Sequence, residues 1–237
     1  MAKRLLLLRH GQALHNVRAE AAREGGCSYD AFLQIMKEDD VLDADLTEIG
    51  RQQARAVAAA RAGMDEPELV VASCLSRALE TAALAFPRTT VAPGRFVCIE
   101  ALREINGYLI NGQRRPRTEL ATRFAACDFS SLSDEHDTQV RHPRTPRPAA
   151  EPPTSQSPHA PGTQWTADLE SNESAAARAY DVLIDLARRR ETYIGVVAHG
   201  GLFHLLLNKH PKARRLARRP MPARLLNSCA SGARAQP

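Results

Sequence analysis

The sequence lacks a long apolar segment. Apolar residues make up 43% of its 237 positions, yet no run approaches the roughly 20 residues that a membrane-spanning helix needs. A basic start at residues 1–4 is followed by only four leucines, fewer than the roughly 7–15 apolar residues of a signal peptide. We therefore expect a cytoplasmic protein that has no membrane partner.

Cysteine is scarce and shows no pairing pattern. The chain has five cysteines, an odd number, and none has CxxC spacing. This spacing favours neither a disulfide framework nor a zinc site. Cys98 lies in the apolar run 96–99, where a buried, reduced thiol is expected, as in a reducing cytosol.

Acidic residues are missing from the last part of the chain. Residues 209–237 hold eight of the 32 lysines and arginines and no Asp or Glu. The formal charge of +5 therefore belongs to this segment, because acidic residues exceed basic ones in the rest of the chain. Nucleic acid is consequently not expected as a partner of the main domain.

Large apolar residues are nearly absent from residues 140–164, which hold seven of the fifteen prolines. This composition predicts a disordered or polyproline-like insertion, more often a solvated loop than a docking segment. The expected organisation is one α/β domain over residues 1–208, interrupted by residues 140–164. A basic, poorly ordered tail over residues 209–237 would follow it.

Short apolar runs alternate with helical patterns along the domain. Strands are expected at residues 5–8, 69–72, 96–99 and 193–198, the first of them as a fully buried strand. Helices are expected at residues 17–23, 28–37, 47–62, 78–84, 173–190 and 202–207. The alternation predicts an α/β fold with a doubly wound, mostly parallel sheet and helices on both of its faces.

Polar residues follow each of these strands. Because ligands bind beyond the carboxyl ends of parallel strands, these residues are expected to meet at one edge of the sheet. They are Arg9, His10, Arg77, Glu104 and His199. Each has a structural alternative as well, such as a turn for His199, a surface position for Arg77 or a pair with Arg103 for Glu104. Asn16 is expected either to contact phosphate or to cap a helix.

Two arginines, two histidines and one carboxylate suit phosphoryl transfer through a histidine. One imidazole would attack phosphorus, and the guanidinium groups with the second imidazole would stabilise the charge on the phosphoryl oxygens. The carboxylic acid would protonate the leaving alkoxide and then accept a proton from water. Cationic side chains would supply the positive charge, so neither a metal nor a cofactor is predicted.

Five motifs carry a family resemblance. Arg9-His10-Gly11 and the segments 45–50, 73–82, 103–104 and 197–201 occur in the order seen in the histidine phosphatase superfamily, phosphoglycerate mutase-like branch. Residues 111–130 and 165–168 resemble plant- and protist-type members of that branch. The chain departs from the pattern at Cys74, where proline is usual, and at Ala198, where Thr or Ser is usual. The proline-rich insertion and the lack of a strand-like run after the last helix are further departures.

The resemblance implies a role for each matching residue. It makes His10 the phosphorylated nucleophile and Glu104 the proton donor. The phosphate pocket would consist of Arg9, Arg77 and His199, with Asn16 and the amide of Gly200 as helpers. Arg114 and Arg115 would either contact the rest of an anionic substrate or simply face solvent. His15 and His204 are expected to be structural.

Several functions are compatible with these residues. A phosphatase for small phosphorylated metabolites is favoured over a mutase, because residues 107–112 do not match the segment that follows the catalytic glutamate in true mutases. An inactive relative could bind partners through the insertion or the tail. An open, shallow pocket would instead favour a phosphopeptide phosphatase. The oligomeric state is left open.

Overall fold

The computed structural model describes residues 3–38, 41–107, 109–137 and 169–213. Its centre is a four-stranded sheet in the order β1-β4-β2-β3, in which every pairing is parallel. The strands coincide closely with the expected apolar runs and are β1 (Arg4–Arg9), β2 (Leu69–Ala72), β3 (Phe96–Cys98) and β4 (Tyr193–Ala198).

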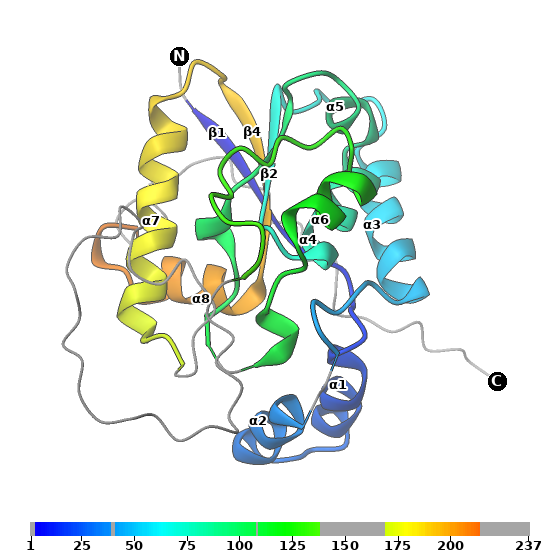
Figure 1. The fold of residues 1–237 in the computed structure, drawn as a ribbon, viewed down its shortest axis with the longest axis vertical. Helices are drawn as coiled ribbons and strands as arrows, with labels where there is room; N and C mark the ends of the chain where they lie inside the picture. Colours follow the sequence, from blue (N-terminus) through cyan, green and yellow to red (C-terminus); the bar gives the residue numbers. More distant parts are fainter. Residues whose placement is uncertain (1–2, 39–40, 108, 138–168, 214–237) are drawn as a thin grey trace.

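Helices connect the strands and cover the sheet (Figure 1). The expected helices are present as α1 (Asn16–Glu24), α2 (Tyr29–Lys37), α3 (Glu48–Ala60), α4 (Ser76–Ala85), α7 (Asn172–Arg188) and α8 (Gly200–Asn208). Short elements that the sequence patterns did not indicate are α5 (Pro87–Thr90), α6 (Arg117–Arg123) and the 3₁₀ turns η1 (Glu100–Leu102) and η2 (Ile110–Gly112). Ser28 caps α2 and Thr47 caps α3, since their side chains accept hydrogen bonds from backbone N–H groups of the first turn.

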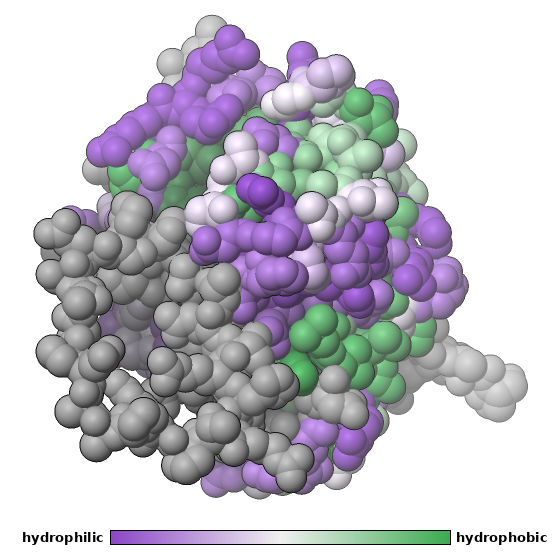
Figure 2. All heavy atoms as spheres, viewed as in Figure 1, coloured by the Kyte–Doolittle hydropathy of each residue, from purple (hydrophilic) through white to green (hydrophobic). Residues whose placement is uncertain are grey.

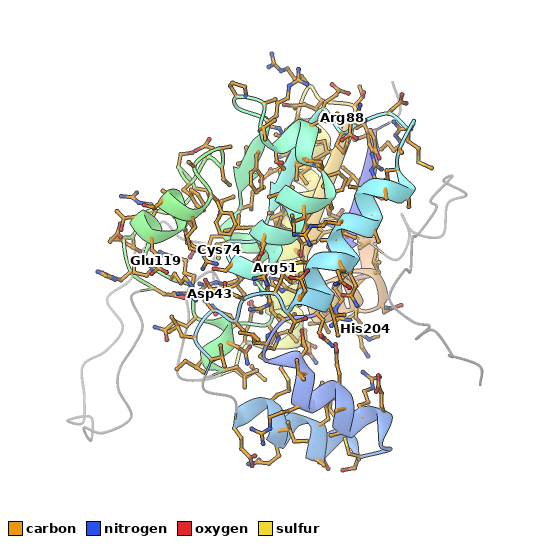
Figure 3. All side chains as sticks on the ribbon, turned by 90° about the vertical axis from the view of Figure 1, so that its right-hand side faces the viewer. Asp43, Arg51, Cys74, Arg88, Glu119 and His204 are labelled. Atoms are coloured by element: carbon orange, nitrogen blue, oxygen red, sulfur yellow. The ribbon has the colours of Figure 1, made fainter. Side chains whose placement is uncertain are left out.

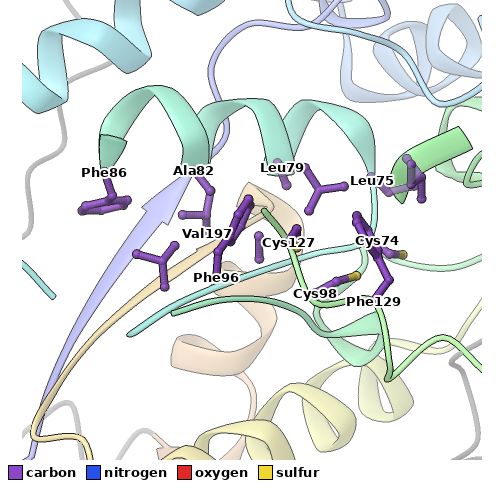
Figure 4. Packing of buried hydrophobic residues seen from close by; sticks show 14 of the residues in the cluster. Cys74, Leu75, Leu79, Ala82, Phe86, Phe96, Cys98, Cys127, Phe129 and Val197 are labelled. Carbon is purple, nitrogen blue, oxygen red and sulfur yellow. The ribbon is translucent and has the colours of Figure 1, made fainter. Parts of the chain in front are cut away.

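The sheet has a hydrophobic core on each face, which confirms the doubly wound arrangement. One core packs α4 against the sheet, with Leu75, Leu79 and Phe86 facing Phe96 and Val197 (Figure 4). The other core packs α7 and α8 against the opposite face. In Figure 1, α7 and α8 accordingly lie on one side of the strands and α3, α4 and α6 lie on the other.

The first strand differs from its expected burial. β1 pairs only with β4 and forms an edge of the described sheet, so its four leucines are half-buried rather than fully buried. The fully buried strands are β2 and β4, whose residues are buried along their whole length. An apolar run shows that a strand packs on both faces but does not show whether it has one neighbour or two.

Two predicted segments lie outside the described residues. Residues 138–168 include the proline-rich insertion, and residues 214–237 include most of the basic tail. The division into domain, insertion and tail therefore stays a prediction. No helix of the described part is long and apolar enough to cross a membrane. On the face shown in Figure 2, hydrophobic residues are exposed in separate areas between hydrophilic ones.

Candidate active site

Two histidines meet at the carboxyl ends of neighbouring strands. His10 follows β1 and His199 follows β4, and the parallel register pairs Arg9 with Ala198, one residue before each of them. Their ring centroids lie 5.0 Å apart at an angle of 61°. His10 is 4% exposed and His199 is fully buried. The expected juxtaposition of these imidazoles is therefore present.

The hydrogen bond of His10 determines which of its nitrogens can react. Nδ1 lies 2.7 Å from the carbonyl oxygen of Gly11. A carbonyl only accepts, so Nδ1 carries the proton and donates it. The remaining nitrogen, Nε2, keeps its lone pair and is the atom that can attack phosphorus.

The surroundings of both imidazoles keep them uncharged. Burial lowers the pKa of His10 well below 6.5, and the charges of Arg77 and Arg9 lower it further. Burial and the charge of Arg77 also lower the pKa of His199 well below 6.5. At neutral pH the site therefore holds neutral imidazoles beside permanent guanidinium charges, so His10 is available as a nucleophile.

Two buried side-chain nitrogens at the site have no hydrogen-bond partner among the described residues. Arg77 is 1% exposed and donates from Nη1 to the carbonyl oxygen of Asn111 at 2.7 Å. His199 contacts Ser73 Oγ through Nε2 at 2.8 Å. Within the described part of the chain, Arg77 Nε and His199 Nδ1 are buried without a hydrogen-bond partner. Unpaired buried polar atoms are rare in folded proteins, and an anion at this site would accept from the guanidinium N–H at Arg77 Nε.

A buried aspartate holds the helix that carries Arg77. Asp43 Oδ1 accepts from the backbone N–H of Ser76 at 2.8 Å, and Oδ2 accepts from its hydroxyl at 2.7 Å. Its backbone has a φ of 43°, in the left-handed region. Burial raises the pKa of Asp43, while the Ser76 hydrogen bonds and the Arg77 charge oppose this. Sequence reasoning missed Asp43, although it lies two residues before the recognised segment 45–50; Figure 3 shows its position.

Glu104 lies at the N-terminus of α8. Its Oε1 accepts from the backbone N–H groups of Ile105 at 3.0 Å and Leu202 at 2.9 Å, and its Oε2 accepts from Gly201 at 3.1 Å. The carboxylate thus lies beside His199, the residue that precedes α8. A Cβ on Gly201 would approach Glu104 Oε1 to 2.7 Å, so a larger residue here would push the carboxylate away from its present position.

Arg178 of α7 holds the main chain that carries Glu104. From Nη1 it donates to the carbonyl oxygens of Ala101 and Arg103, and from Nη2 to that of Glu104, each at 2.8 Å. Its Nε and Nη2 donate to the two carboxylate oxygens of Glu170 at 2.9 and 2.7 Å. Both side chains of this ion pair are almost fully buried. No sequence pattern indicated a role for this arginine, because charged residues are ordinary on one face of an amphipathic helix.

Arg9 and Asn16 lie at the rim of the histidine pair. The Arg9 side chain is 46% exposed and lies 3.4 Å from Glu20. It also lies against Gly200, where a Cβ would be 3.3 Å from Arg9 Cδ. The Asn16 side chain closes the turn before α1, because its Oδ1 accepts from the backbone N–H of Ala13 at 3.1 Å. This bond does not cap α1, because Ala13 lies before the helix and the N-cap residue is His15 without a side-chain cap, so the helix-capping alternative for Asn16 is wrong.

The expected role of Arg114 and Arg115 is corrected. Arg114 is 3% exposed, and its guanidinium donates to Glu100 and to the backbone carbonyl oxygens of residues 115, 134, 135 and 136. Arg115 pairs with Glu119 at 2.9 Å and Asp45 at 3.4 Å. The structure therefore places both in the packing of the 109–137 segment. Basic residues in a loop-like sequence do not show whether their partners belong to the protein or to a ligand.

The residues that depart from the family pattern leave the histidine pair in place. Cys74 is buried next to Ser73, and burial raises its pKa to about 11, so the thiol stays protonated.

The expected burial of Cys98 is confirmed. Among the described residues, no three His, Cys, Asp or Glu side chains group in a way that could hold a metal ion.

Comparison with known proteins agrees with the motifs. The family model of the histidine phosphatase superfamily, branch 1, matches residues 38–136, which include Arg77 and Glu104. A phosphoglycerate mutase-like protein of Arabidopsis thaliana is 28% identical over 89% of this chain and 75% of its own length. Phosphoglycerate mutase-like protein 1 of the same plant is 28% identical over 86% of this chain and 71% of its own length.

The solved structures that match this chain include two phosphatases. A mycobacterial glucosyl-3-phosphoglycerate phosphatase has 25% identity and a TM-score of 0.48, with 92% of this chain and 84% of that chain covered. The alpha-ribazole phosphatase of Shigella flexneri has 19% identity and a TM-score of 0.46, with 86% and 77% covered.

The chain is therefore similar to the histidine phosphatase superfamily over residues 38–136, and over most of its length it is similar to phosphoglycerate mutase-like proteins.

Proposed function

We propose that this protein hydrolyses phosphomonoesters of small metabolites through a phosphohistidine on His10. The observation that carries the proposal is the state of His10, which is buried and uncharged and has a free Nε2. This nitrogen lies beside His199 and near Arg77, whose buried Nε donor has no protein acceptor among the described residues. A phosphoryl group at His10 would provide the missing acceptor oxygens.

In the first step, His10 Nε2 attacks phosphorus and forms the N–P bond while the ester P–O bond breaks. The protonated carboxyl group of Glu104 gives its proton to the leaving alkoxide. Arg9, Arg77 and His199 stabilise the negative charge on the phosphoryl oxygens. The products of this step are the alcohol, phosphohistidine and the Glu104 carboxylate.

In the second step, a water molecule attacks phosphorus and the N–P bond breaks. Glu104 accepts the proton of the attacking water, which restores its acidic form, and the bond electrons return to His10 Nε2. Inorganic phosphate leaves the site. One carboxyl group thus serves as the acid and then as the base, and no net proton is gained or lost by the enzyme.

The first experiment is hydrolysis of p-nitrophenyl phosphate by purified protein in the presence of EDTA. We expect metal-free turnover by the wild type and none by His10→Ala. His204→Ala is the matched control, because His204 is an exposed histidine of α8 (Figure 3). Absence of turnover by folded wild-type protein would contradict the phosphatase, as would activity of His10→Ala equal to that of the wild type.

A mutase is the second candidate, because the matched plant proteins are named phosphoglycerate mutase-like. It would share the first step and return the phosphoryl group to a monophosphoglycerate instead of water. Protein phosphorylated with ³²P on His10 separates the two. Release of labelled inorganic phosphate at the same rate with and without monophosphoglycerate supports the phosphatase, whereas label transferred to monophosphoglycerate supports the mutase.

A further inference from the structure

A third histidine lies beside the pair. His15 directly precedes α1 and is 6% exposed, and its ring centroid is 6.2 Å from that of His10 at an angle of 45°. The sequence suggested only a structural role for it. The hydrogen bond between His15 and the neighbouring Asn16 determines which ring nitrogen of His15 carries the proton.

The orientation of the Asn16 amide follows from its contact with Ala13. The side-chain oxygen accepts from the backbone N–H of Ala13 at 3.1 Å, so the other amide atom is the nitrogen, Nδ2. Nδ2 lies 3.1 Å from His15 Nε2. An amide nitrogen only donates, so His15 Nε2 accepts and the ring proton of the neutral imidazole is on Nδ1.

The Nδ1–H of His15 is a buried donor with no acceptor among the described residues. Burial lowers the pKa of His15 well below 6.5, and the charges of Arg77 and Arg9 lower it further. Both of these neighbours are basic groups, and neither of them supplies an anionic acceptor. The imidazole is therefore neutral at pH 7 and keeps one N–H available for a ligand oxygen.

We propose that His15 Nδ1 donates a hydrogen bond to a non-bridging oxygen of the phosphoryl group that is transferred to and from His10. His15 is then a further phosphoryl-binding side chain besides Arg9, Arg77 and His199. Asn16 is a positioning residue that acts through His15, because its hydrogen bond to His15 Nε2 keeps the ring proton on Nδ1. This inference rests on the proposed phosphohistidine chemistry, because that chemistry brings a phosphoryl group to His10.

The test compares two substitutions of His15. His15→Phe keeps an aromatic ring and removes the donor, whereas His15→Gln keeps an N–H donor. For His15→Phe we expect kcat/KM for p-nitrophenyl phosphate to fall by about 10²-fold, near the lower end of the loss for one removed transition-state donor. Inhibition by orthovanadate, which resembles the phosphoryl group in transfer, should weaken as well. His15→Gln should recover part of the lost kcat/KM and part of the lost orthovanadate inhibition. His204→Phe should change neither quantity.

A purely structural His15 would give a different result. The melting temperature of His15→Phe would fall, while the orthovanadate inhibition constant and kcat/KM of the folded fraction would stay within about threefold of the wild type, well under the loss expected for a donor. That outcome overturns the inference. Partial recovery by His15→Gln at an equally lowered melting temperature supports it, because the amide restores the donor without restoring the packing.

The wild-type protein gives a readout that does not depend on any substitution folding. In protein with ¹⁵N-labelled imidazoles, His15 should be protonated at Nδ1, and orthovanadate should shift that proton resonance. Protonation at Nε2, or no response to bound orthovanadate, overturns the inference. Wild-type protein that neither hydrolyses p-nitrophenyl phosphate nor binds orthovanadate overturns the proposed function and this inference together. An active wild type with unaffected His15 variants overturns the inference alone.

Discussion

His10 shows how the site prepares a nucleophile without a strong base beside it. Its Nδ1 donates to the Gly11 carbonyl, and burial with the charges of Arg77 and Arg9 keeps the ring neutral. The same guanidinium groups that would bind phosphate therefore also keep the imidazole in its reactive form. Binding and activation are two effects of one arrangement of charges.

The residue-scale prediction concerns the pH dependence of phosphoryl transfer. Because the pKa of His10 lies well below 6.5, the ring stays unprotonated as the pH falls through that value. The acid limb of kcat/KM that reports His10 should therefore be centred below pH 6.5. In Arg9→Gln the limb should move upward, since the charge of Arg9 is one cause of the lowered pKa.

The pH profile is measured with p-nitrophenyl phosphate from about pH 4 to pH 8, the range that contains the ordinary histidine pKa. A limb centred at or above pH 6.5 in the wild type would contradict the buried, uncharged state of His10. If the acid limb of Arg9→Gln lies at the same pH as that of the wild type, the charge of Arg9 does not contribute to the lowered pKa of His10.

The residues of the site differ in how far the sequence could predict them. Arg9, His10, Arg77, Glu104 and His199 were predictable because each follows an apolar strand, and strand ends meet at one edge of a parallel sheet. Asp43, Arg178 and Glu170 were not, because their partners are backbone groups far away in the sequence. Arg114 was misplaced for the same reason, since backbone carbonyls occupy its donors.

At the scale of elements, α7 and α8 together hold Glu104. The N-terminus of α8 binds its carboxylate, and Arg178 of α7 binds its main-chain carbonyl. The backbone N–H of Asn106 also donates to Glu170, the ion-pair partner of Arg178. The segment from η1 to Asn106 is therefore attached to two helices that pack against each other.

The prediction for these elements is that Arg178→Lys impairs acid catalysis by Glu104. Lysine keeps the charge but lacks the planar fork that reaches three carbonyl oxygens and a carboxylate. We expect kcat/KM for an alkyl phosphate such as glycerol phosphate to fall by about 10²-fold, at the lower end of what general acids contribute. The loss should be smaller for p-nitrophenyl phosphate, because its leaving group needs little protonation.

Controls separate this effect from a loss of folding. Arg188→Lys changes an exposed arginine of the same helix and should leave both substrates unaffected. In a double variant with Glu104→Gln, Arg178→Lys should add little further loss, because both changes remove the same contribution. An equal loss on both substrates, or fully additive losses, would show that Arg178 acts on stability and not through Glu104.

The elements themselves were mostly predictable, with differences at their ends. β2 and β4 have the expected bounds, because apolar runs bounded by polar residues define buried strands well. The helix α8 begins at Gly200, two residues before its expected start, because the Glu104 carboxylate caps a turn that contains two glycines. The short helices α5 and α6 have no strong periodicity and were not expected.

At the scale of the whole molecule, three buried histidines couple stability to pH. His10, His15 and His199 all have a pKa well below 6.5 in the folded state. Below about pH 6.5 the unfolded chain binds protons at these positions and the folded chain does not, so acid favours unfolding. The free energy of unfolding should fall by up to about 1.4 kcal/mol per pH unit for each histidine.

Urea unfolding at several pH values between about 4.5 and 7.5, on both sides of the ordinary histidine pKa, measures this slope. His15→Gln should reduce it by up to about 1.4 kcal/mol per pH unit, the share of one histidine, whereas His204→Gln changes an exposed side chain and should leave it unchanged. A slope that is the same in His15→Gln as in the wild type would contradict a buried, neutral His15 in the folded state.

The sequence by itself determined the α/β alternation, the strand-end residues and, through the order of its motifs, the resemblance to the histidine phosphatase superfamily. These depend on local periodicity and on the rule that parallel strands end at one edge. Only the tertiary structure decided that β1 is an edge strand, that Arg114 and Arg115 pack within the chain, and that Arg178 and Asp43 hold the site. It also revealed the free Nδ1 donor of His15. Burial and hydrogen-bond partners arise between residues distant in sequence, so no local pattern records them.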